Sequence, residues 1–215
     1  NRLGENSVIN MGVLNQISHK IFVKNFDKEN FEFSIDCSEL ESFVLKKFSN
    51  LFEINKNSKF IDKTLENFFN IDIILNLFPN AKFLHCFRNL NDAVNAIFQS
   101  LLPTLSWTHN LDDITIYIDD YLKTINYFKN KYPDKIMDIK LENLTKENEK
   151  ISKQIFNFCN LEWNEKSLNF NKKKNFQIKT TSNVQLRDKV KNYDYDKYKQ
   201  YKFILRDYKT KYKWI

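Results

Sequence analysis

The chain has 215 residues and a formal net charge of +7, and this length favours one domain over residues 1–215 with a core of ordinary size. A hydrophobic fraction of 42% and an aromatic fraction of 15% exclude a disordered chain, and no apolar run approaches the roughly 18 residues that a membrane span needs. There are only 2 glycines, Gly4 and Gly12, so the chain contains no Gly-rich phosphate-binding loop.

The first third of the chain alternates between predicted helices and strands. A capping box at residues 38–41 predicts a helix that runs to about residue 52. Residues 59–61 predict a short buried strand. Residues 65–77 carry apolar side chains on nearly all sides, which predicts a buried helix that ends before Pro79.

The middle of the chain begins with the clearest strand, residues 82–87, which ends at Arg88. A helix is predicted over residues 92–102. A longer helix follows, which we expect Asn110 and Asp113 to cap at its N-terminus; its apolar residues recur with helical spacing until it ends before Pro133.

Residues 135–140 predict another strand, and residues 149–158 another helix. In the last segment, apolar and aromatic residues recur at spacings of three and four: Tyr198, Tyr201, Leu205, Tyr208 and Tyr212. This stripe favours packing in the core over a platform for stacking nucleic-acid bases.

Strands that alternate with helices predict an α/β fold with a parallel sheet and helices on both of its faces. In such sheets a ligand binds at the carboxyl ends of the strands. Lys63, Arg88 and Glu142 each lie at or just past the end of a predicted strand, so we expect these charged residues on the rim where a ligand binds. Residues that leave a strand are often polar in any case.

The three cysteines, Cys37, Cys86 and Cys159, are widely spaced and odd in number. This pattern favours reduced, buried thiols in a cytoplasmic protein over a disulfide framework. The three histidines are equally scattered, and His85 and Cys86 should point to opposite faces of their strand, so we expect no metal site.

Positive charge concentrates at the end of the chain, where residues 171–215 contain 14 Lys and Arg against 4 Asp. Such a segment indicates either an anionic partner or a solvated lysine-rich surface. Only four of the 34 basic residues are arginines: Arg2, Arg88, Arg187 and Arg206. In a chain so rich in lysine, each arginine is a candidate for bidentate binding of a phosphate or carboxylate.

A series of short motifs, in one order along nearly the whole chain, resembles the sulfotransferases. The likeness is greatest to the tyrosylprotein sulfotransferases and to bacterial sulfotransferase domains that follow tetratricopeptide repeats. The motifs are Asp62-Lys63, the FPNAKFL run at 78–84, Arg88 with Asp92, NLDD at 110–113, YPDKI at 132–136, LENL at 141–144, FCNLEW at 158–163, TSNVQLR at 181–187 and KYKQY at 197–201.

This resemblance implies a three-layer α/β/α, P-loop-like fold that uses 3′-phosphoadenosine 5′-phosphosulfate as sulfuryl donor, without a metal. In the family, the loop that binds the 5′-phosphosulfate precedes a Gly-Glu pair, which resembles Gly4-Glu5 here. The chain begins with Asn1 rather than Met and has no signal peptide behind it. We therefore expect a fragment whose upstream part, with that loop, is missing.

Five residues match family positions with a role in the reaction. By resemblance, Glu5 is the base for the acceptor, Lys63 stabilises the bridging oxygen, and Ser182 contacts the donor near the reacting sulfate. Arg88 matches the arginine that holds the donor 3′-phosphate, and Lys197 a basic residue that reaches a donor phosphate. Outside this context, Glu5 would be a surface carboxylate and Lys197 a solvated lysine.

Two positions depart from the family pattern: Ala96 replaces a serine that contacts the 3′-phosphate, and Leu141 replaces a tyrosine that contacts the nucleotide. A degenerate relative that binds a nucleotide or partner without chemistry is therefore the alternative to an active enzyme. The hypothesis of a nucleic-acid-binding module rests on the basic C-terminus alone, because the sequence contains no motif for stacking bases or for binding in a groove. For the enzyme, a peptide, a saccharide or a small hydroxyl compound remains open as acceptor.

Overall fold

The computed structural model describes residues 8–9, 26–27, 32–33, 42, 46, 59, 61–172 and 189–215. The chain divides into two compact units, residues 1–81 and residues 82–215. The helix predicted over residues 38–52 falls mostly outside the described part, where only Ser42 and Lys46 are assigned, both as helical.

The first unit contains two short strand pairs. Strand β1 (Val8–Ile9) pairs in parallel with β4 (Ile61–Asp62), and β2 (Phe26–Asp27) pairs antiparallel with β3 (Glu32–Phe33). Strand β4 confirms a strand directly before Lys63. Its predicted burial is wrong at Ile61, which is 45% exposed.

The helix predicted over residues 65–77 forms in two parts, the 3₁₀-helix η2 (Leu65–Asn70) and the α-helix α3 (Ile71–Leu77). The backbone of Asn70 is not helical (φ −112°, ψ 16°), which separates the two. Ile71 and Leu77 are buried, whereas Leu65 is exposed, so only the second part is the buried helix that the sequence predicts. Helix α3 ends immediately before Phe78-Pro79, as expected.

The second unit is built on β5 (Phe83–Phe87), which pairs in parallel with β6 (Ile136–Lys140) so that Phe87 lies opposite Lys140. Both strands confirm the prediction. His85 and Cys86 point to opposite faces, also as predicted, but the face that carries Cys86 is exposed. The prediction of a strand buried on both faces, with a buried Cys86 thiol, is therefore wrong for the described residues.

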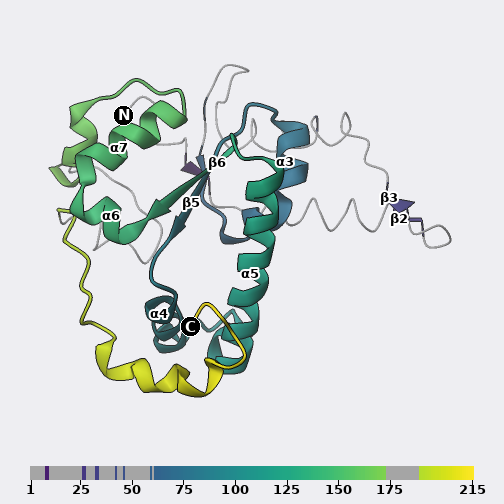
Figure 1. The fold of residues 1–215 in the computed structure, drawn as a ribbon. Helices are drawn as coiled ribbons and strands as arrows, with labels where there is room; N and C mark the ends of the chain where they lie inside the picture. The colour runs from purple at the N-terminus through teal and green to yellow at the C-terminus, as the bar shows by residue number, and fades with distance from the viewer. Residues whose placement is uncertain are drawn as a thin grey trace. The chain divides into compact units, whose positions relative to one another are not determined.

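Two helices follow β5. Helix α4 (Leu90–Ser100) begins after the N-cap Asn89, two residues earlier than predicted. Helix α5 (Leu111–Lys131) begins after Asn110, whose Oδ1 accepts a hydrogen bond from the Asp112 N–H at 2.8 Å. Asn110 is thus the predicted cap, and Asp113 instead lies within the first turn. Helix α5 runs alongside β5 and β6 (Figure 1).

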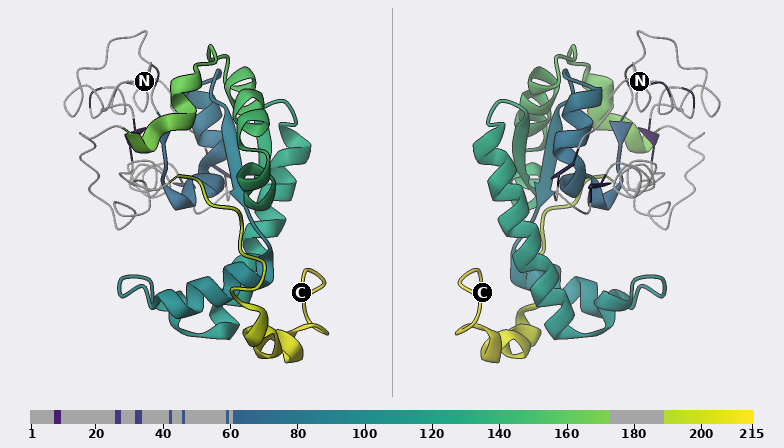
Figure 2. Two further views of the ribbon diagram at one scale, coloured as in Figure 1. Left: turned by 90° about the vertical axis from the view of Figure 1, so that its left-hand side faces the viewer. Right: turned by 90° about the vertical axis from the view of Figure 1, so that its right-hand side faces the viewer.

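The core of the second unit joins three segments that are distant in sequence. Val94 of α4, Ile114 and Ile118 of α5, and Leu205 of the 3₁₀-helix η7 (Lys199–Tyr208) form one buried cluster. Figure 2 shows the C-terminal segment in yellow beside α4. The C-terminal stripe therefore packs in the core, as the sequence predicts, although it adopts 3₁₀ rather than α geometry.

The remaining elements of this unit are short: η3 (Ser106–His109), α6 (Leu141–Lys146), α7 (Asn148–Phe158) and η4 (Glu165–Lys172). Helix α7 matches its prediction within one residue, and α6 was not predicted. The architecture is mixed α/β with parallel strand pairing. In the part of the chain that the structure describes, no helix is long and apolar enough to cross a membrane.

Candidate anion site at the end of strand β5

Arg88 lies where the sequence predicts it, between the last residue of β5 and the N-terminus of α4. Here the Oδ1 of Asn89 accepts a hydrogen bond from the Asp92 N–H at 3.2 Å, and the N–H of Asn89 itself donates to Glu142 Oε1 at 2.8 Å. The next two N–H groups, of Leu90 and Asn91, precede the helical hydrogen bonds and have no partner among the described residues. They are donors for an anion at a helix N-terminus.

Arg88 and Lys197 both lie near the ring of Tyr198. The Arg88 Cζ lies 5.9 Å from the centroid of the Tyr198 ring, and the Lys197 Nζ lies 5.1 Å from it. Tyr198 is buried. Neither cation forms a salt bridge within the described part of the chain. Because neither cation is held in an ion pair with a described carboxylate, both can interact with an anionic ligand.

Glu142 has a structural role rather than the exposed position on the rim that its place in the sequence suggests. It follows β6 as predicted, but it is only 4% exposed. One carboxylate oxygen holds the Asn89 N–H, and the other, Oε2, is buried without a partner among the described residues. Glu142 therefore fixes the turn that presents Arg88.

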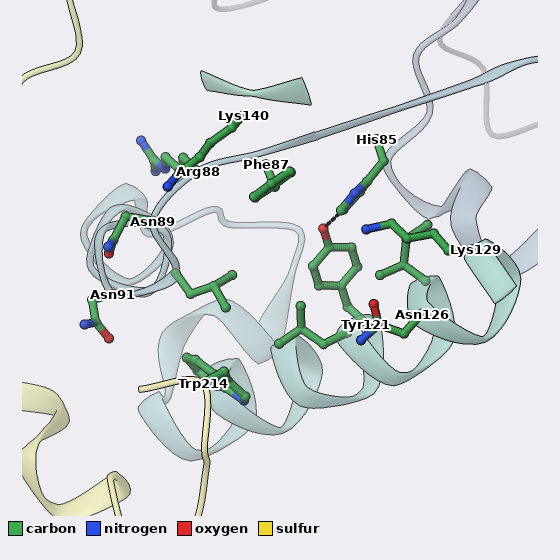
Figure 3. Close-up of a pocket in the computed structure, with 13 residues that line it drawn as sticks. His85, Phe87, Arg88, Asn89, Asn91, Tyr121, Asn126, Lys129, Lys140 and Trp214 are labelled. Atoms are coloured by element: carbon green, nitrogen blue, oxygen red, sulfur yellow. Dashed lines mark hydrogen bonds between the residues drawn. The ribbon is translucent and has the colours of Figure 1, made fainter. Parts of the chain in front are cut away.

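A pocket of about 300 Å³ opens beside this turn. Arg88 and Lys140 lie together at one end of the pocket, and Tyr121 and Lys129 lie away from them (Figure 3). Among the described residues that line the pocket there is no carboxylate. The pocket therefore favours an anionic ligand.

A polar cluster lies at the other end of the pocket. His85 Nδ1 lies 2.6 Å from Asp138 Oδ1, and its Nε2 accepts a hydrogen bond from the Tyr121 hydroxyl (Figure 3). Lys129 Nζ forms an ion pair with Asp138 at 2.6 Å. The ring of His85 is thus held from both sides, with its Nδ1–H directed at the carboxylate.

Burial lowers the pKa of His85 below 6.5, and Lys129 adds to this, against the opposing effect of Asp138. Burial also acts to raise the pKa of Asp138, but the hydrogen bonds from Lys129 and His85 outweigh it, so that this pKa lies below 3.8. At neutral pH the cluster holds a neutral imidazole between a carboxylate and a phenol.

These shifts predict a pH dependence of stability. Since the pKa of His85 is lower in the folded chain, the unfolded chain binds more protons, and the free energy of unfolding should fall as the pH drops below 6.5. Asp138 acts in a separate window, because its stabilising effect is lost only as the pH falls below 3.8. Urea unfolding between about pH 7.5 and 5 should therefore show a smaller pH dependence for His85→Gln than for the parent chain. The exposed His109 provides the control, and an equal change in His109→Gln would contradict the assignment to His85.

The other predicted site residues are placed locally or not at all. Lys63 is exposed and directly follows β4, where Asp62 Oδ1 accepts hydrogen bonds from the N–H and hydroxyl of Thr64 at 2.9 and 2.7 Å. Lys63 belongs to the first unit. Glu5 and Ser182 lie outside the described residues, so their roles stay predictions. Within the described ranges, no three His, Cys, Asp or Glu side chains are grouped to hold a metal ion.

Sequence reasoning missed Lys140, the His85 cluster and Tyr193. The position of Lys140 at the end of a predicted strand was a usable signal, because neighbouring parallel strands end at the same edge. Tyr193 donates its hydroxyl hydrogen bond to Asp92, and no sequence pattern links two residues so far apart.

Comparison with known proteins identifies two similarities. The sequence profile of the "Sulfotransferase family" matches residues 12–165. An uncharacterized protein of Aquifex aeolicus (strain VF5) is 28% identical over 155 residues, which cover 70% of this chain but only 20% of that protein. The match thus spans about a fifth of the length of this relative.

Proposed function

Because the chain belongs to the sulfotransferase family, we propose that it transfers a sulfuryl group from 3′-phosphoadenosine 5′-phosphosulfate to a hydroxyl acceptor. The observation that carries the proposal is the anion site of the second unit. There Arg88 Cζ and Lys197 Nζ lie 5.9 and 5.1 Å from the centroid of the Tyr198 ring, and Arg88 directly precedes two N–H groups of α4 that have no partner among the described residues. Such donors are suited to a doubly charged phosphate. We further propose the three-layer, P-loop-like form of the fold, a single domain over residues 1–215 and a cytoplasmic location.

The residues present fit such a donor. Arg88 supplies a planar fork of N–H groups, and the N-terminus of α4 supplies fixed dipoles, so both bind phosphate without reorganising. Lys197 adds a mobile cation. Glu142 contributes indirectly, because its bond to the Asn89 N–H holds the turn in place.

The remaining roles follow from the family. The donor supplies a sulfuryl group on a phosphate leaving group. Glu5 would take the proton of the acceptor hydroxyl while the oxygen of that hydroxyl forms the new O–S bond. Lys63 would stabilise the phosphate oxygen that is released as the old S–O bond breaks. Ser182 would contact the donor beside the reacting sulfate. No metal takes part in this scheme.

Sulfate transfer tests the proposal directly. The full-length protein should move radiolabelled sulfate from 3′-phosphoadenosine 5′-phosphosulfate to at least one acceptor in a panel of peptides, saccharides and phenols. Lys63→Ala should abolish transfer but leave donor binding almost unchanged, since the family role of Lys63 lies in the reaction. Donor binding without transfer to any acceptor would instead support the degenerate relative that Ala96 and Leu141 suggest.

A further inference from the structure

Tyr193 joins the C-terminal segment to both sides of the Arg88 turn. Its hydroxyl donates a hydrogen bond to Asp92 Oδ2 in the first turn of α4, and its backbone N–H donates to Thr145 Oγ1 in α6 at 3.1 Å. Asp92 is 9% exposed, so the phenol satisfies a nearly buried carboxylate. Burial and the bond to Asp92 raise the pKa of Tyr193, which keeps the hydroxyl protonated as a donor.

These bonds complete a closed ring around the turn. Thr145 Oγ1 donates to the Glu142 carbonyl at 3.1 Å, Glu142 Oε1 accepts the Asn89 N–H at 2.8 Å, and α4 connects Asn89 with Asp92. The ring therefore ties three segments together: the β5–α4 turn, α6 and the C-terminal segment. Arg88 directly precedes Asn89, a member of the ring.

Lys197 lies between two anchored positions. Tyr193 is fixed by the ring, and Tyr198 is buried with Arg88 over its face. Between them, Asp194 Oδ1 accepts the Asp196 N–H at 3.0 Å, which forms a compact turn. The backbone of Lys197 is thus held at both ends, so that it loses little backbone entropy when its side chain binds an anion.

We propose that Tyr193 is a positioning residue that holds Lys197 beside Arg88 at the anion site. This inference rests on the proposed function, in which both cations bind phosphates of the donor. Without the phenol–Asp92 bond, the segment before Lys197 has one anchor fewer, and Lys197 contributes less to binding.

Calorimetric titration with 3′-phosphoadenosine 5′-phosphate tests this in the full-length protein. Tyr193→Phe removes only the hydroxyl and should weaken binding about tenfold, the scale of one hydrogen bond to a charged group. Tyr195→Phe is the matched control, because Tyr195 is 67% exposed, and it should bind like the parent. Thr145→Val should weaken binding as well, whereas Thr145→Ser keeps the acceptor and should restore it.

A double-mutant cycle separates positioning from a general loss of structure. If Tyr193 acts through Lys197, Lys197→Ala should leave little further effect for Tyr193→Phe to add. Full additivity of the two changes would overturn the role of Tyr193 but not the proposed function. The same holds if Tyr193→Phe binds the ligand like the parent protein while Arg88→Ala binds it weakly. Failure of the parent protein to bind the ligand would overturn the inference and the proposed function together.

Discussion

Replacement of Arg88 by alanine should weaken the binding of 3′-phosphoadenosine 5′-phosphate by about 2–4 kcal/mol, or roughly 30- to 1,000-fold. Among the described residues the guanidinium has no carboxylate partner, and the N–H groups of Leu90 and Asn91, which follow it at the start of α4, have no partner either. Its charge is therefore available to a ligand. Ala96 and Leu141 remove two hydroxyl donors found in the family, so Arg88 should carry more of the binding energy than usual.

The geometry of the arginine matters as well as its charge. Arg88→Lys keeps the charge but loses the planar fork, and it should recover only part of the affinity. Arg206→Ala removes an equal charge from an exposed position of η7 and should have little effect. Calorimetric titration of the three variants measures each effect. If Arg88→Ala binds the ligand as tightly as the parent protein, the nucleotide site is not at the end of β5.

Replacement of Leu205 by alanine should destabilise the second unit by about 2–5 kcal/mol. Leu205 is 1% exposed and packs with Val94, Ile114 and Ile118, so truncation leaves a cavity between η7, α4 and α5. The loss reflects both the buried apolar surface and the incomplete collapse of the neighbours around the cavity.

Phe203 offers the matched control for this change. It belongs to the same 3₁₀-helix but is 62% exposed, so Phe203→Ala should change the free energy of unfolding by less than about 0.5 kcal/mol. Urea unfolding followed by tryptophan fluorescence measures both variants. Similar stability of Leu205→Ala and Phe203→Ala would contradict the place of the C-terminal segment in the core.

Much of the second unit follows from local sequence. The short, mostly apolar run at residues 83–87 produces a strand, and the helical spacing of apolar residues between Asn110 and Pro133 produces α5, because each pattern concerns neighbours along the chain. Arg88 is equally local, since a residue directly after a strand and before a helix lies at the carboxyl edge whatever packs around it. The resemblance of the motifs to the sulfotransferases predicts a phosphate ligand for Arg88 without any knowledge of packing.

The contacts that complete the anion site depend on tertiary structure. Glu142 accepts a hydrogen bond from the N–H of Asn89, which lies 53 positions away in the sequence. Tyr193 donates a hydrogen bond to Asp92, which lies 101 positions away. Arg88 lies near the ring of Tyr198, which is buried and far from it in sequence, and Lys197 lies near the same ring. Such pairings depend on loop closure and on the packing of whole elements, which no local periodicity encodes. The exposed face of β5 has the same origin, because apolar residues predict burial, but only the elements present beside a strand decide which of its faces are covered.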